Sequence, residues 1–421
     1  MGTQKLTVVF PNADFSQYYL AGVAARFGLW EQLYPKYRPE FVGQPGRQIW
    51  YSQTAEADPK LLAKVPDLPP YHVLNISPPP LAIVCLPLAW FSFTAAFKVW
   101  MSCLFLAMFG ATVCAAKIYR RLGGSSGVVE GAFYLIGMVL PLLPHLIGGG
   151  DNVHMMLVFC TGVAVLVWAS GQAAVLATSL IVPGIFKGVT AAWCPLLLFK
   201  PVKWQTLAWM AAWAILLNGA VVYLGGIQPY NTWRQDILPD AQSMDVQGNW
   251  DHTMNLKGMA SHWGWDNFPA SAMKGLHLAG LAVLYFGYWK QRDAKPTDAF
   301  ANLCATVVGL QLLFMWCNPI SWQFYVSYLL PFAGWGVLEY QQCPTPAREK
   351  IHILAGILIL LIPPLHFGLL QFVWHVPKGA FLTVRDLFFG LEILFFVFAC
   401  RRLFFARSWE FSPPASPKTG V

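Results

Sequence analysis

Long apolar stretches alternate with short polar segments along most of the chain, and this pattern predicts a bundle of membrane-crossing helices. A helix needs about 20 apolar residues to cross a bilayer. Two shorter apolar arms lie between residues 172 and 200, around Pro183 and Lys187, and predict a broken or bent pair. The remaining predicted spans are 98–118, 127–147, 153–170, 204–224, 271–289, 300–316, 322–340, 350–371 and 381–404. The expected fold is therefore all-α, with about 11 membrane segments.

The first 97 residues follow a different pattern. Residues 11–77 mix charges, prolines and glycines, which predicts a long segment outside the membrane that carries short helices. Residues 78–96 are apolar but interrupted by several prolines, as in an interfacial or re-entrant segment. The predicted organisation is an extracytoplasmic segment over 1–97, a transmembrane domain over 98–404 with an extracytoplasmic loop at 225–270, and a cytoplasmic tail over 405–421.

Composition supports a membrane protein. The chain is 56% hydrophobic and only 11% charged, whereas an ordinary soluble domain is about 25% charged. The formal net charge of +8 comes from Lys and Arg in short loops, without a basic stripe interleaved with aromatic residues, so no nucleic-acid partner is expected. Membrane lipids are the expected surroundings.

Positive charges orient the predicted spans. If the spans alternate as predicted, the Lys and Arg residues fall on one face, which the positive-inside rule assigns to the cytoplasm. The opposite face collects the N-terminal segment and the polar loops, so the candidate motifs share one extracytoplasmic side of the plasma (inner) membrane. With Asp14 outside, a further helix is expected upstream, and Leu6–Phe10 has the character of its last residues. The positive groups are Lys117 to Arg121, Lys200 to Lys203, Lys290 to Lys295, Arg348 to Lys350 and Arg401 to Arg407.

The sequence contains no pattern that predicts a metal or a cofactor. The nine cysteines form no CxxC pair and no Cys/His spacing typical of zinc, and most lie in apolar stretches where a small packing residue is expected. Three histidines at irregular spacing, His252, His262 and His277, do not form a metal motif. No acidic cluster suits a divalent cation. We expect neither metal nor cofactor.

An acidic-aromatic motif stands near the start of the chain. Asp14 is followed by the Tyr18–Tyr19 pair and by the small residues Ala21 and Gly22. A carboxylate followed by paired tyrosines is typical of a transferase of lipid-linked sugars at the boundary of water and lipid. Further along come Leu33-Tyr34-Pro35, Ser77-Pro78-Pro79-Pro80-Leu81 with Pro87 seven residues later, Lys187, and Asn318-Pro319-Ile320-Ser321-Trp322.

In its residues and their order, this series of motifs resembles glycosyltransferase family 87, over about residues 10–340. The resemblance implies a polytopic GT-C transferase that takes a sugar, most often mannose, from a polyprenyl-phosphate donor. The acceptor would be a lipid or glycolipid hydroxyl. Two departures, Phe324 where members usually carry His and Gly-Gly-Asp-Asn where Gly-Gln-Val-Asn is usual, bear on the sugar and the phosphate contacts. The resemblance also implies a first membrane helix, which is expected upstream of these motifs.

The chemistry of such a transfer needs few protein groups. A carboxylate must take the proton of the acceptor hydroxyl, and cations must stabilise the charge that grows on the phosphate. The resemblance gives the base role to Asp14, although a helix N-cap would also suit it. Tyr18 and Tyr19 could line the substrate pocket or belong to an interfacial aromatic belt. Lys187 could hold the donor phosphate or extend to the interface.

Three further groups are candidates for substrate binding. Asp151 and Asn152 could hold sugar hydroxyls, although Gly-Gly-Asp-Asn is also ordinary turn chemistry. His252 and Lys257 are candidates for the phosphate in a polar, tryptophan-rich loop that could equally be solvated. The remaining candidates are Asn255 in the same loop, and Ser321, Trp322 and Tyr325 at the start of a predicted span.

Two other functions remain open. A transporter or flippase would show two similar halves with broken helices at matching positions, and the sequence contains a single broken pair and no internal repeat. An inactive homologue that binds a lipid without turnover is the second alternative, because the chain lacks the family's usual His at Phe324. A membrane-embedded hexosyltransferase is the function that the sequence favours.

Overall fold

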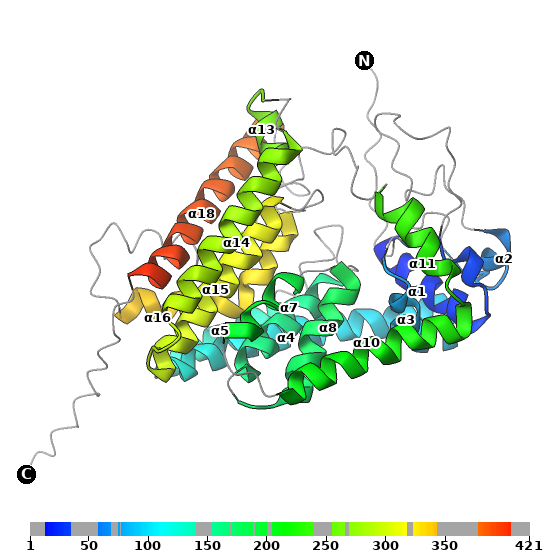
Figure 1. The fold of residues 1–421 in the computed structure, drawn as a ribbon, viewed down its shortest axis with the longest axis horizontal. Helices are drawn as coiled ribbons and strands as arrows, with labels where there is room; N and C mark the ends of the chain where they lie inside the picture. The colour runs from blue at the N-terminus through cyan, green and yellow to red at the C-terminus, as the bar shows by residue number, and fades with distance from the viewer. Residues whose placement is uncertain are drawn as a thin grey trace, which may run out of the picture.

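The structure is a computed structural model, and every regular element that it describes is helical. Figure 1 shows two groups of long helices with a group of short helices at one end. The residues described are 13–34, 58–68, 75, 77–139, 153–168, 170–187, 190–199, 204–239, 255–265, 269–317, 323–342 and 378–405.

The short helices of the N-terminal part pack into one module. Their bounds are α1 (Ala13–Arg26), η1 (Trp30–Gln32), α2 (Pro59–Leu62), α3 (Pro80–Cys85) and η3 (Leu86–Trp90). The side chains of α1 from Phe15 to Ala25 are buried, because the helix is apolar on nearly every side and has little amphipathic character. Gly22 allows α1 to approach α3 closely, since a Cβ atom at this position would overlap the backbone carbonyl of Cys85. We call this unit the N-terminal module.

The first group of long helices consists of α4 (Phe93–Arg121), α5 (Gly127–Val139), α7 (His154–Val167), α8 (Ala173–Lys187) and α10 (Trp204–Gly225). Ser92 caps α4, accepting a hydrogen bond from the amide of Ala95 at 3.3 Å. Figure 1 shows α4 and α10 running toward the N-terminal module. The C-terminal end of α10 contacts the module at Gly225, where an added Cβ would overlap the indole of Trp30.

The second group contains α14 (Ala270–Lys290), α15 (Pro296–Cys317), α16 (Ala333–Gln342) and α18 (Lys378–Phe404). Helices α14 and α15 interlock, because Gly280 receives Leu313 and Gly309 receives Leu284. The shorter elements between and beside the two groups are η5 (Ala191–Trp193), α9 (Leu196–Phe199), α11 (Gln228–Thr232), the π-helix η6 (Trp233–Ile237), α13 (Leu256–His262) and η9 (Gln323–Phe332).

A buried ionic network joins three helices of the second group. Arg402 of α18 lies 3.0 Å from a carboxylate oxygen of Asp298 on α15, and 3.5 Å from Glu339 on α16. The indole of Trp335 donates to Glu339 at 3.0 Å. All three ionic side chains are less than a tenth exposed as residues. Because breaking a buried ion pair leaves an uncompensated charge, this network fixes α18 against α15 and α16.

Within the described residues, three helices are long and apolar enough to cross a membrane, namely Phe93–Arg121, Trp204–Gly225 and Pro296–Cys317. They coincide with three of the predicted spans. Helices α14 and α18 also occupy predicted spans, whereas α5 and α7 are shorter within the described residues than the spans predicted there. The predicted span 350–371 lies outside the described residues, and the total of about 11 segments stays a prediction.

Two predicted segments differ in detail from the structure. Helix α8 continues through Pro183 to Lys187, so the first arm is not broken at the proline, and the second arm is described as the short helices η5 and α9. The predicted span 322–340 begins as η9, a 3-10 helix, and continues as the α-helix α16. Pro331 lies near this junction, and its ring disfavours an α-helix in the turn that precedes it.

Alanine at Gly22 is expected to lower the thermal stability of the detergent-solubilised protein, because its Cβ would push α1 away from α3. Overpacking of this kind costs about 1–3 kcal/mol. Gly219 on α10 is the matched control, since nothing lies within 4 Å of an added Cβ there. Alanine in an open helical position is favoured over glycine by about 1 kcal/mol. Equal melting temperatures for Gly22→Ala and Gly219→Ala would contradict the close approach of α1 and α3.

Candidate functional site

Asp14 lies inside helix α1, as the second residue of its described length. Its backbone is helical, whereas an N-cap residue has a non-helical backbone. Tyr18 follows four residues later, about 6 Å along the same face of the helix. The helical spacing that the sequence predicted for this pair is therefore present in the structure.

Tyr18 connects the N-terminal module to both α4 and α8. Its side chain is 1% exposed. The ring centroid lies 5.1 Å from that of Trp100 on α4 and 5.7 Å from that of Phe186 on α8, the latter in an edge-to-face arrangement. Phe186 directly precedes Lys187, the last residue of α8. The packing of Tyr18 thus brings the helix that carries Asp14 against the end of the helix that carries Lys187.

Tyr19 and Tyr34 hold the N-terminal module together with hydrogen bonds to the backbone. The Tyr19 hydroxyl donates to the carbonyl of Phe91 at 2.8 Å, and the Tyr34 hydroxyl donates to the carbonyl of Ser77 at 2.8 Å. Burial raises the pKa of both phenols above its ordinary value, so both remain neutral donors. Three motifs that are far apart in the sequence therefore meet in this module.

His154 and Tyr328 join two other parts of the chain. His154 begins α7 and is 1% exposed, and its Nδ1 lies 2.8 Å from the hydroxyl of Tyr328 on η9. The predicted residues Asp151, Asn152, Ser321 and Trp322 precede these two helices but lie outside the described residues, and Tyr325 lies in η9. No local sequence pattern predicts this pair, because 174 positions separate its members.

The predicted residues of the 225–270 loop lie at α13. Asn255 is fully buried, and its side-chain oxygen accepts a hydrogen bond from the amide of Gly258 at 2.6 Å, as a residue that caps a helix does. Lys257 is exposed on the same helix, and His252 lies outside the described residues. Figure 1 shows α13 apart from α1, so the structure does not bring Lys257 to the acidic-aromatic motif.

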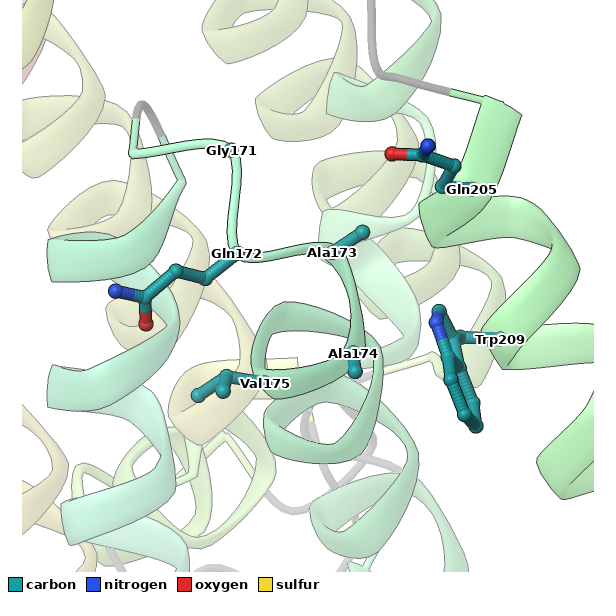
Figure 2. A pocket seen from close by; sticks show the side chains of 7 residues that line it. All are labelled: Gly171, Gln172, Ala173, Ala174, Val175, Gln205 and Trp209. Atoms are coloured by element: carbon teal, nitrogen blue, oxygen red, sulfur yellow. The ribbon is translucent and has the colours of Figure 1, made fainter.

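An open pocket of about 450 Å³ lies between the beginning of α8 and the beginning of α10. Figure 2 shows Gln205 and Trp209 on α10, opposite Gln172 and Val175. Lys187 stands at the other end of α8, and a helix of 15 residues is about 22 Å long. The pocket is therefore remote from the end of α8 that meets Tyr18.

The described residues include no group of three or more His, Cys, Asp or Glu side chains close enough to hold a metal ion. The expected absence of a metal stays a prediction, because part of the loops lies outside the described residues. Of the predicted site residues, Asp14 belongs to α1 and Lys187 is the last residue of α8. One offers a carboxylate and the other an ammonium group. They suit proton transfer and stabilisation of an anion, respectively.

Comparison with known proteins gives one match. No curated protein and no solved structure matches the chain significantly. The family model of glycosyltransferase family 87 matches residues 75–315, which is more than half of the chain and includes α3, α4, α8, α10 and most of α15. The matched region includes the Ser77–Leu81 motif and Lys187, whereas Asp14, the Tyr34-Pro35 step and Asn318–Trp322 lie outside it. The chain therefore belongs to glycosyltransferase family 87 and is a membrane glycosyltransferase.

Proposed function

We propose that the protein transfers a hexose, most simply mannose, from a polyprenyl-phosphate donor to a hydroxyl of a lipid or glycolipid on the extracytoplasmic face of the plasma (inner) membrane. The observation that carries the proposal is the contact of Tyr18 with Phe186, which joins the helix of Asp14 to the end of the helix of Lys187. A carboxylate and a cation on adjoining elements are the two groups that such a transfer requires.

Asp14 is the proposed general base. The oxygen of the acceptor hydroxyl attacks the anomeric carbon while the carboxylate of Asp14 takes the hydroxyl proton. The bond between the anomeric carbon and the phosphate oxygen breaks, and its electron pair leaves with the polyprenyl phosphate. A single in-line displacement inverts the anomeric centre, as in inverting glycoside hydrolysis, where water takes the place of the acceptor hydroxyl.

Lys187 is the proposed partner of the donor phosphate. The leaving group is a phosphate monoester, whose charge grows as the bond breaks, and an ammonium group stabilises that charge. A lysine at the end of an apolar helix is costly unless it serves a function. His252 and Lys257 remain further candidates for this role, although α13, which carries Lys257, lies apart from α8 in Figure 1.

The other substrate residues would shape the two sugar sites. Tyr18 and Tyr19 would line the substrate pocket next to Asp14, because they follow it on the same helix and both rings are buried. Asp151, Asn152, Ser321, Trp322 and Tyr325 are assigned to the donor or acceptor hydroxyls. The contact of His154 with Tyr328 supports this grouping, because it joins the helices that follow the two segments. Asn255 would act indirectly, as the cap of α13.

Asn in place of Asp14 is expected to reduce the transfer of radiolabelled mannose from synthetic polyprenyl-phosphate mannose by about a hundredfold or more, because the amide cannot accept the proton. The same change at Asp58 is the matched control. Asp58 caps α2 by accepting from the amide of Lys60 at 2.9 Å, and Asn caps a helix equally well. Transfer that survives Asp14→Asn would refute the base assignment, and no transfer by the unsubstituted protein from any polyprenyl-phosphate sugar would favour an inactive homologue.

Met in place of Lys187 is expected to raise the KM for the donor about 10- to 100-fold, because a hydrogen bond to a charged group is lost. Inhibition by polyprenyl phosphate, the released product, should weaken by a similar factor. Lys187→Arg should retain most of the affinity. Lys290→Met, an exposed lysine at the far end of α14, is the control. An unchanged donor KM in Lys187→Met would exclude the phosphate role.

A further inference from the structure

Two exposed tryptophans form a rigid corner next to α13. Trp263 is 48% exposed and Trp265 is 63% exposed, and their rings meet edge to face with centroids 6.4 Å apart. Gly264 between them has a positive φ of 84°. The amide of Trp265 donates to the carbonyl of Ala260 at 2.8 Å, the long-range bond of a Schellman C-cap. The backbone that carries the two indoles therefore has a defined, hydrogen-bonded conformation.

The corner is also fixed at its base. Asn255 caps the beginning of α13, so both ends of this short helix are stabilised. The ring of Trp263 packs edge to face on Phe389 of α18 with centroids 6.1 Å apart, and its indole nitrogen donates to a carboxylate oxygen of Asp386 at 3.4 Å. Phe389 in turn packs against Trp316 at the end of α15. Aromatic contacts therefore tie the corner to two long helices.

A tryptophan ring held in place by its neighbours and a nearby carboxylate are two groups that suit the binding of a sugar ring. The C–H face of a pyranose packs on the flat face of an indole, and a carboxylate accepts hydrogen bonds from sugar hydroxyls. A tryptophan of the interfacial belt would instead direct its indole N–H toward the headgroups. In Trp263 this N–H is directed to Asp386.

We propose that Trp263, Trp265 and Asp386 bind a sugar ring of the acceptor, which makes the acceptor a glycolipid and not a lipid without sugar. The inference rests on the proposed function. The donor sugar must lie at Asp14, where its anomeric carbon is attacked, and Figure 1 shows α13 apart from α1. A pyranose at the corner therefore belongs to the acceptor, whose glycan extends from the corner toward α1.

Binding of a sugar can be measured without turnover. The full chain in lipid nanodiscs is mixed with methyl α-D-mannopyranoside, and saturation transfer from the protein to the ring protons of the sugar is recorded. With the unsubstituted protein, saturation transfer to the sugar protons is expected. Trp265→Ala should weaken the affinity about tenfold, because one stacking face is lost, and Trp265→Phe should retain most of it. Trp204→Ala, which removes an exposed tryptophan at the start of α10, should leave the affinity unchanged.

Three outcomes would overturn the proposal. The first is no saturation transfer to the sugar in the unsubstituted protein, and the second is a sugar affinity that Trp265→Ala leaves unchanged. The third is an equal loss of sugar affinity in Trp265→Ala and Trp204→Ala, as expected if both tryptophans only anchor the protein in the membrane. The proposed function is tested separately. Asp14→Asn should lose turnover and keep binding at the corner. Sugar binding that depends on Trp265 in a protein without transfer activity would refute the proposed function and leave the corner as a sugar site.

With active protein, the acceptor KM provides an independent test. Trp265→Ala should raise the KM for a mannosylated lipid about tenfold and leave the KM for the donor unchanged. A rise in the donor KM alone would place the donor at the corner and overturn the assignment to the acceptor.

Discussion

The close packing of α1 on α3 is the constraint on which the proposed catalytic arrangement depends. Gly22 leaves no room for a side chain against the backbone of Cys85, so the position of α1 along and around its axis is set by backbone contact. Four residues before Gly22, Tyr18 packs between Trp100 and Phe186. The helix that carries Asp14 is thus located by rigid groups on α3, α4 and α8, as a catalytic carboxylate requires.

The second group of helices supplies a support of a different kind. Within the membrane there is little hydrophobic gain in bringing helices together, so packing of small residues and polar contacts must hold them. Gly280 and Gly309 permit α14 and α15 to interlock, and Arg402 joins Asp298 to Glu339 between α15, α16 and α18. The corner formed by Trp263 and Trp265 is built on the opposite ends of α15 and α18 from this network. Its geometry therefore depends on helices that are fixed by charge at one end and by aromatic packing at the other.

The sequence predicted the parts of this structure that are local. Span lengths follow from apolar stretches, and the placement of Asp14 and Tyr18 on one helix face follows from a spacing of four residues. Helix α1 belongs to a segment predicted to lie outside the membrane, and its burial was not predicted, although a helix that is apolar on nearly every side indicates a buried position. The ring contact of Tyr18 with Phe186 and the hydrogen bond of His154 with Tyr328 could not be predicted, since each joins residues more than 150 positions apart that no local pattern relates.

The separation of the two proposed sites has a consequence for the acceptor. The carboxylate proposed to take the proton belongs to α1, and the tryptophan corner follows α13, which lies apart from α1 in Figure 1. One sugar ring cannot contact both. If the corner holds one sugar of the acceptor while a hydroxyl of the same molecule reacts at Asp14, the acceptor must carry more than one sugar. The distance between the two sites then selects for the length of the acceptor's glycan. Binding energy gained at the corner, remote from the reacting atoms, would then position the hydroxyl for attack and so favour an elongating transfer over the first glycosylation of a lipid.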